Sequence, residues 1–255
     1  MGTLHRTARR LVERLASVDM ERAIGKSFFV IYREERKDAW YSYRATLRSV
    51  LERYEVDHVI DVGANTGQFG RLARSIYSGR ISSFEPVSHV FAGLADAIAS
   101  DKSWNVYQCA LGAQSGTKTI NVSASSVYSS LLKANNFCAA RFGNRALGER
   151  EESVTVRRLD EVLEEISSGN HQQKIYLKLD TQGYDIEAFK GLGEQLRNVV
   201  ALQSEVSLIP LYEGMPHWTE SISIYEKAGF GVAGMFPVSW DAGRVVEYDC
   251  VLTRI

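Results

Sequence analysis

The segment His58-Val-Ile-Asp-Val-Gly-Ala-Asn-Thr-Gly-Gln-Phe-Gly70 joins a short apolar run to a glycine-rich turn. An apolar run of this length that is broken by glycine is typical of a buried parallel strand. Residues Gln68 to Tyr77 then have helical character. The segment therefore predicts a strand, a tight turn and a helix, which is the unit from which doubly wound sheets are built.

The turn has a spacing of its own, with Gly63 and Gly67 separated by three residues and preceded by Asp61. Glycine lets the backbone turn sharply and approach a ligand closely, and Asn65 between the two glycines tolerates a left-handed conformation. The dinucleotide fingerprint places its first glycines as GxG instead. A pyrophosphate favours bare amide groups, so a carboxylate such as Asp61 repels it, whereas a ligand with an amino group would be attracted.

The next two predicted strands add features of a nucleoside site. Gly79-Arg-Ile-Ser-Ser-Phe-Glu-Pro86 reads as a second strand that stops at the proline. Glu85 at its end can accept hydrogen bonds from both ribose hydroxyls and would reject a 2′-phosphate. A third strand, Asn105 to Leu111, ends in small and apolar residues that could border an adenine ring. Together these features favour S-adenosylmethionine, which has a ribose, an adenine and an amino acid but no phosphate.

Beyond these strands the alternation of strands and helices continues. It predicts an α/β fold, namely a Rossmann-like doubly wound and mostly parallel sheet with a C-terminal β-hairpin. The economical organisation is a catalytic domain at 47–255 with an N-terminal helical extension at 1–46. Residues 123–145 form a long connection, which we expect to shape an acceptor pocket or a lid. The expected helices are 45–51, 88–100, 159–166, 186–196 and 220–228, and the later strands are 117–122, 154–156, 174–180 and 198–205, with the hairpin at 230–236 and 247–253.

The first residues carry an apolar pattern at helical spacing. Leu4, Ala8, Leu11, Val12 and Leu15 recur with arginines between them. One interpretation is an amphipathic helix docked on the main domain. The other is a basic helix that makes peripheral contact with an anionic membrane surface.

Composition narrows the function classes. The 255 residues are 45% apolar and 24% charged, with a formal net charge of −1, so a folded core is expected and a general nucleic-acid binder is disfavoured. The cysteines Cys109, Cys138 and Cys250 are widely spaced, which excludes a zinc ribbon or a dense disulfide framework. The sequence shows neither an apolar stretch of transmembrane length nor the apolar core of a signal peptide. A cytoplasmic location is therefore expected.

Four residues are candidates for chemistry. Asp180 ends a predicted strand and should point into the crevice beyond the carboxyl ends of the sheet. Lys178 leaves the same face of that strand and needs a carboxylate partner, for which Asp180 and Glu205 are both candidates. Glu205 ends the following strand, and His217 lies in the loop after it, so both are further candidates for a base. Asp180 and Glu205 could together hold Mg²⁺, but two carboxylates are weak evidence and we assign no metal site.

Several segments resemble the FkbM-type family of S-adenosylmethionine-dependent methyltransferases. The resemblance rests on Val59-Ile-Asp-Val-Gly-Ala-Asn-Thr-Gly-Gln68, Ser83-Phe-Glu-Pro86, Cys109-Ala-Leu-Gly112, Val156-Arg-Arg-Leu-Asp160, Tyr176-Leu-Lys-Leu-Asp-Thr-Gln-Gly-Tyr-Asp185 and Glu205-Val-Ser-Leu-Ile-Pro-Leu-Tyr-Glu-Gly214. It covers the chain from about residue 47 to the end. The resemblance implies an O-methyltransferase that acts on a hydroxyl of a sugar, glycolipid, polysaccharide or related metabolite. Gln182 departs from the glutamate of many members, which argues against an ionised base or a metal ligand at that position.

The candidate sites are then as follows. We assign the donor site to Asp61, Gly63, Asn65, Thr66, Gly67, Gln68, Glu85, Pro86, Ala110, Leu111 and Asp180. Two rivals stay open: an NAD-dependent oxidoreductase on a similar fold, and a nucleotide-binding scaffold without catalysis. The acceptor, the position methylated and homo-oligomer formation are not decided by the sequence.

Overall fold

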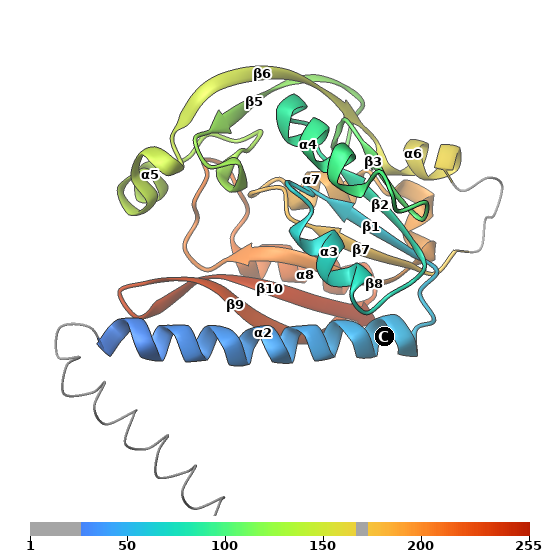
Figure 1. The fold of residues 1–255 in the computed structure, drawn as a ribbon, viewed down its shortest axis with the longest axis horizontal. Helices are drawn as coiled ribbons and strands as arrows, with labels where there is room; N and C mark the ends of the chain where they lie inside the picture. The colour runs from blue at the N-terminus through green and yellow to red at the C-terminus, as the bar shows by residue number, and fades with distance from the viewer. Residues whose placement is uncertain (1–26, 167–172) are drawn as a thin grey trace, which may run out of the picture. The chain divides into compact units, whose positions relative to one another are not determined.

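The computed structural model describes residues 27–166 and 173–255, with side-chain surroundings from residue 38 onward (Figure 1). The chain divides into two compact units, Met1–Ser42 and Tyr43–Ile255. The predicted helix around residues 4–15, and with it the predicted membrane contact, lies outside the described residues. Within the part that is described, no helix is long and apolar enough to cross a membrane.

The main sheet is doubly wound. Its strands are β1 (His58–Val62), β2 (Arg80–Phe84), β3 (Trp104–Tyr107), β7 (Ile175–Leu179), β8 (Val199–Ser207), β9 (Phe230–Asp241) and β10 (Arg244–Arg254). In the described residues they lie in the order β3-β2-β1-β7-β8-β10-β9, which can be followed in Figure 1. The first five of these are parallel, and β10 pairs antiparallel with both β8 and β9. Strand order reverses between β1 and β7, and ligands bind beyond the strand ends at such a switch point.

Helices cover both faces of this sheet because its strands are apolar on both sides. On one face, Ile60 and Leu177 pack with residues of α6 (Leu159–Ile166), α7 (Asp185–Lys190) and α8 (Trp218–Lys227). On the other face, Val59 and Tyr176 pack with α3 (Gln68–Arg74), α4 (Ser88–Ile98) and the C-terminal part of α2 (Ser27–Arg53). The predicted fold class, a mostly parallel Rossmann-like sheet with a C-terminal hairpin, is confirmed.

A small second sheet follows β3. It consists of β4 (Ala110–Leu111), β5 (Gly116–Ser123) and β6 (Gly148–Arg157) in the order β4-β6-β5. Between β5 and β6 lies an insertion, residues 124–147, which holds helix α5 (Asn136–Phe142) and the short 3₁₀ turns η1 (Ser126–Tyr128) and η2 (Gly143–Arg145). The insertion therefore extends from the second sheet rather than from the main one.

Three predicted elements differ from the structure. The predicted third strand divides, since Tyr107 ends β3 and Ala110–Leu111 pair with β6 of the second sheet. The predicted helix 186–196 is the short α7 followed by the 3₁₀ segment η3 (Gly193–Asn198), since the chain leaves the helix at Gly191. The predicted helix 45–51 is the C-terminal part of the much longer α2.

Candidate active site

The loop after β1 packs directly on the end of β7. Gly63 and Ala64 donate backbone hydrogen bonds to the Phe84 carbonyl of β2, and Gly63 has a positive φ of 76°. A Cβ atom built on Gly63 would lie 1.9 Å from the carbonyl oxygen of Asp180. Only glycine permits this approach, so the loop and Asp180 form one continuous wall at the switch point of the sheet.

Glu85 ties the same loop to the end of β2. Its Oε2 accepts from the backbone N–H of Asn65 at 2.8 Å, and its Oε1 accepts from that of Val87 at 2.9 Å. Burial raises the pKa of Glu85 to about 7, and the two backbone hydrogen bonds oppose that rise. A carboxylate oxygen has two lone pairs, so each oxygen keeps one acceptor position after these bonds are made.

The remaining donor-site candidates differ in exposure. Thr66 and Gln68 are exposed and Pro86 is half-buried. Asn65 is half-buried with a positive φ of 48°, and its Oδ1 accepts from the Thr66 N–H. Ala110 and Leu111 are buried in β4 and so belong to the second sheet, not to the tip of β3 as predicted.

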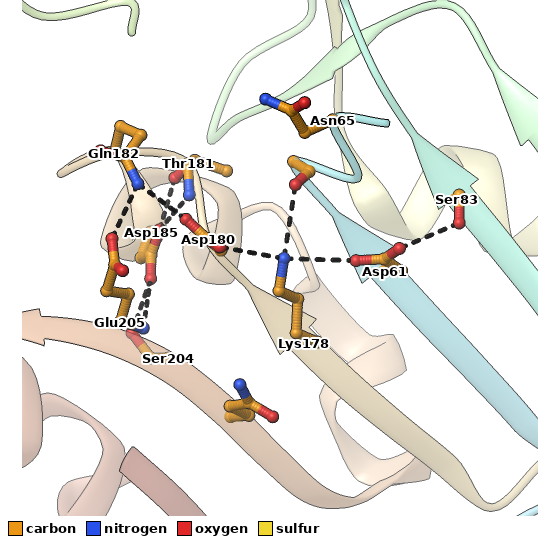
Figure 2. A network of polar contacts seen from close by, with 12 residues as sticks. Asp61, Asn65, Ser83, Lys178, Asp180, Thr181, Gln182, Asp185, Ser204 and Glu205 are labelled. Carbon is orange, nitrogen blue, oxygen red and sulfur yellow. Dashed lines mark hydrogen bonds and ion pairs between the residues drawn. The ribbon is translucent and has the colours of Figure 1, made fainter. Parts of the chain in front are cut away.

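Asp61 lies beneath the loop rather than on its surface. It is fully buried on the sheet face that α3 covers, where its Oδ2 accepts from the Ser83 hydroxyl at 3.0 Å. Its Oδ1 lies 3.4 Å from Nζ of Lys178, which is its neighbour across β1 and β7 (Figure 2). Burial raises the pKa of Asp61, and the ammonium group of Lys178 opposes the rise. Asp61 therefore engages an internal cation in this structure.

Lys178 connects this buried acid to the strand end. Its Nζ lies 3.2 Å from Oδ2 of Asp180 and donates to the Gly63 carbonyl at 3.3 Å. Burial lowers the pKa of Lys178, but the carboxylates of Asp180 and Asp61 outweigh burial and raise it above its ordinary value. The sequence left the partner of Lys178 open between Asp180 and Glu205. The structure pairs it with Asp180 and Asp61.

Glu205 joins Asp180 through Gln182 instead. The Nε2 group of Gln182 donates to Asp180 Oδ1 at 2.9 Å and to Glu205 Oε2 at 2.8 Å (Figure 2). Burial, followed by the charges of nearby carboxylates, raises the pKa of Glu205 well above its ordinary value. Asp180 keeps 30% of its side chain exposed, and Gln182 and Glu205 are also only half-buried, so this group of side chains can meet a ligand.

His217 takes no part in these contacts. It is exposed at the N-terminus of α8, where its Nδ1 lies 2.7 Å from the Thr219 hydroxyl and accepts from the Thr219 N–H. None of the contacts found for the described residues links it to Asp180 or Glu205. The structure thus brings Lys178, Asp180 and Glu205 together and leaves His217 as a helix cap.

Two acids of β10 were missed by sequence reasoning. Asp249 pairs with Glu205 across β8 and β10, and Glu247 accepts hydrogen bonds from Ser239 and Ser207. Burial raises the pKa of both carboxyls, to about 6 for Asp249. The strand alternation places Glu247, Asp249 and Val251 on one face, but their pairing with β8 depends on a register that the sequence does not show.

Asp185 holds the loop after β7 in place and was also missed as a contributor. Its Oδ1 accepts from the backbone N–H and the hydroxyl of Thr181, and its Oδ2 accepts from the Ser204 hydroxyl at 2.7 Å (Figure 2). Its position in the segment Tyr176 to Asp185, which resembles the FkbM family, was the sequence feature that could have identified it. Asp185 therefore fixes the loop that carries Gln182 against β8.

The insertion contacts both strand-end loops. The Ser126 hydroxyl donates to Oδ1 of Asn65 at 3.0 Å, and the Ser130 hydroxyl donates to the Gln182 carbonyl at 2.7 Å. Residues of the insertion also share an apolar cluster with Leu211 and Tyr212 from the loop after β8. Within the described residues, no group of three or more His, Cys, Asp or Glu side chains is arranged to hold a metal ion.

The sequence of these strand ends matches a known family. Residues 61–232 match the methyltransferase FkbM domain, which covers more than half of the chain. The chain belongs to the FkbM methyltransferase family. All the candidate residues from Asp61 to His217 lie inside the matched region, whereas Glu247 and Asp249 of this FkbM protein lie beyond it.

Solved structures give distant likenesses to this FkbM protein. An rRNA methylase from Streptococcus thermophilus has a TM-score of 0.45 and 8% identity, with 84% of this chain and 95% of that chain covered. The magnesium protoporphyrin IX methyltransferase from Synechocystis, solved with bound SAM, has a TM-score of 0.43 and 12% identity over 93% and 96% of the two chains. Aeropyrum pernix fibrillarin, also with SAM, has a TM-score of 0.44 and 9% identity over 77% and 66%. No curated protein matches the chain.

Proposed function

We propose that this FkbM-family protein transfers the methyl group of S-adenosylmethionine to a hydroxyl of a sugar, glycolipid or related metabolite. The observation that carries the proposal is the continuous wall that the β1 loop and Asp180 form at the β1–β7 switch point. There the Gly63 loop packs on the Asp180 backbone, and Glu85 and Asp180 stand at either side of the loop. Ligands of doubly wound sheets bind at this position.

The residues of this wall fit an adenosine donor. Glu85 has acceptor positions left for the ribose hydroxyls, and the loop from Gly63 to Gly67 offers backbone at close range. When bound, the donor supplies an electrophilic methyl group on a cationic sulfur, and the carboxylates of Asp180 and Glu205 suit a positive charge.

Asp180 is the proposed catalytic residue of the acceptor side. An alcohol is a weak nucleophile, so a base that takes its proton at the moment of attack speeds the reaction by about 10²–10⁴-fold. Asp180 has an exposed part, and its Oδ2 and Oδ1 are held by Lys178 and Gln182 respectively. These two contacts fix the orientation of the Asp180 carboxyl group on the acceptor side of the site.

The donor assignment is tested by calorimetry. We expect S-adenosylmethionine to bind the wild-type protein and NAD not to bind. Glu85→Ala should weaken donor binding by about tenfold to a hundredfold, the value of one or two hydrogen bonds to a charged group. Glu220→Ala, which removes an exposed carboxylate on α8, is the matched control and should bind the donor as the wild type does. Binding of NAD without binding of S-adenosylmethionine would reverse the proposal in favour of an oxidoreductase.

The acceptor assignment is tested with a labelled methyl donor and a panel of glycans and lipid extracts. Asp180→Asn should lower turnover by about 10²-fold or more. Its donor affinity should stay within about threefold of the wild type, because the asparagine keeps the shape of the side chain. A fully active Asp180→Asn protein would remove Asp180 from the mechanism. Donor binding without label transfer to any compound of the panel would favour the non-catalytic scaffold.

A further inference from the structure

The side chain of Gln182 lies between two acidic residues, Asp180 just after β7 and Glu205 within β8. One amide nitrogen donates to Asp180 at the end of β7 and to Glu205 on β8, at 2.9 and 2.8 Å (Figure 2). An amide nitrogen has two hydrogens, so both of its donor positions are used by carboxylates. Gln182 is thus the direct link between the two acids nearest the proposed acceptor site.

The orientation of this amide is fixed by the two carboxylates that face its nitrogen. The hydroxyl of Tyr212 lies 2.8 Å from Oε1 of Gln182 and 3.1 Å from the Tyr128 carbonyl oxygen, so its single proton is available to either of these two acceptors. If the amide were turned over, its carbonyl oxygen would face two carboxylates and its nitrogen would face the Tyr212 hydroxyl. The network therefore selects one orientation. Tyr212 is buried, so its hydroxyl is held against the amide by the packing around it.

The backbone of Gln182 is also held in an unusual conformation. Its φ of 55° lies in the left-handed region, which a non-glycine residue adopts rarely. The Ser130 hydroxyl of the insertion donates to its carbonyl, and Asp185 accepts from the neighbouring Thr181. Such a conformation persists only where surrounding contacts determine it, and it aims the side chain at both acids.

The Gln182 amide offsets the repulsion between Glu205 and the carboxylates around it. Asp180 faces Glu205 from the end of β7, Asp185 from α7, and Glu247 and Asp249 from β10. Farther along the same network lie one cation, Lys178, and one further acid, Asp61. Lys178 compensates Asp180, whereas Glu205 has the Gln182 amide. Removal of this neutral donor leaves Glu205 among carboxylates alone.

We propose that Gln182, which contacts Tyr212 at its other end, is the positioning residue that joins Asp180 and Glu205 into one acceptor-binding pair. The inference rests on the proposed function, because it assigns the pair to the acceptor side of that site. Gln182 acts through the two carboxyl groups and does not itself exchange a proton. A neutral amide keeps the two carboxyl groups at a fixed separation, and Asp180 also contacts Lys178.

The test follows the Glu205 carboxyl directly by ¹³C NMR of glutamate-labelled protein over a pH series, without any acceptor. In Gln182→Leu, loss of a hydrogen bond to the charged form should raise the pKa of Glu205 by about one pH unit. Tyr212→Phe should shift it in the same direction by less, since the amide loses one contact and keeps both carboxylate contacts. Ser130→Ala removes a contact to the Gln182 backbone but none to its amide, and serves as the matched control with little shift expected. A Glu205→Gln protein assigns the resonance.

Gln182→Glu gives a second measurement that keeps the shape of the side chain. It replaces the donor with a carboxylate at neutral pH, and a protonated glutamate can still donate one hydrogen bond. The pH profile of kcat should therefore move to lower pH, with donor affinity unchanged. If Glu205 titrates in Gln182→Leu as in the wild type, with the near-UV spectrum of both proteins native, the inference is overturned.

The two proposals can fail separately. A Glu205 shift without methylation of any compound would support the pair and contradict the proposed function. Methylation with an unchanged Glu205 titration would support the function and contradict the role of Gln182.

Discussion

At the scale of single residues, the contact between the β1 loop and Asp180 rests on the absence of a side chain and on one buried cation. Gly63 allows the two backbones to meet, and Lys178 lies below them with its ammonium group near Asp61, Asp180 and the Gly63 carbonyl. Both residues contact the same part of the site, the junction of the β1 loop with Asp180. Changes here should therefore affect the fold and donor binding together.

Gly63→Ala is expected to destabilise the protein by about 3 kcal/mol or more, because a Cβ atom cannot lie 1.9 Å from a carbonyl oxygen and the φ is positive. Urea unfolding measures the loss. Gly93→Ala is the control, since Gly93 lies exposed in helix α4 with no atom near the added methyl group. A helical glycine replaced by alanine should gain about 0.5–1 kcal/mol. Equal stability of the wild type and Gly63→Ala would show that the loop can move away.

At the scale of elements, the β8–β10 pair places like charges opposite each other. Asp249 of β10 is the direct partner of Glu205 on β8, and like charges in that arrangement are unfavourable. Burial, followed by the charge of Asp180, raises the pKa of Asp249 from 3.8 to about 6. The site therefore carries a cost in stability that depends on pH.

The sign of this cost follows from the direction of the shift. The unfolded chain ionises Asp249 near pH 4 and the folded protein near pH 6, so stability falls as pH rises through that window. Asp249→Asn should be more stable than the wild type above pH 6, by up to about 3 kcal/mol, and equal to it near pH 4. Urea unfolding at both pH values measures this. The control is Asp96→Asn, on the exposed side of α4. The same gain at both pH values would contradict the electrostatic cause.

The elements also show how far the sequence alone could lead. The apolar run of β1, its glycine turn and the acids at strand ends are local patterns, so they predicted the fold and the place of Glu85 and Asp180. Glu205 was predicted to end its strand, but β8 continues to Ser207. The pairing of Lys178 with Asp61 depends on the register of β1 with β7, which no local pattern contains. The bridge at Gln182 needs Tyr212 from a distant loop. The sequence placed Ala110 and Leu111 in the main sheet, whereas they pair with β6 of the second sheet. Two residues form too short a pattern to distinguish one sheet from the other.

At the scale of the whole molecule, the site depends on helices that cover both faces of the sheet. On the α3 face, the C-terminal part of α2 contributes the buried side chains of Tyr43, Leu47, Val50 and Leu51. The Tyr43 hydroxyl donates to Gln203 of β8 at 2.7 Å, next to Lys178 in the sheet register. This part of α2 therefore belongs with the methyltransferase domain, although the family match begins only at residue 61.

Two truncations test this boundary. A chain of residues 43–255 keeps the whole second compact unit, so its unfolding free energy and donor affinity should stay close to those of the full chain. A chain of residues 55–255 loses four buried apolar side chains, each of which contributes about 1.5–3 kcal/mol. Their sum approaches the entire stability of a typical domain, about 5–15 kcal/mol, so this shorter chain should not fold. Urea unfolding and calorimetry with S-adenosylmethionine compare the three proteins. A folded, donor-binding 55–255 chain would show that the α3 face does not need α2.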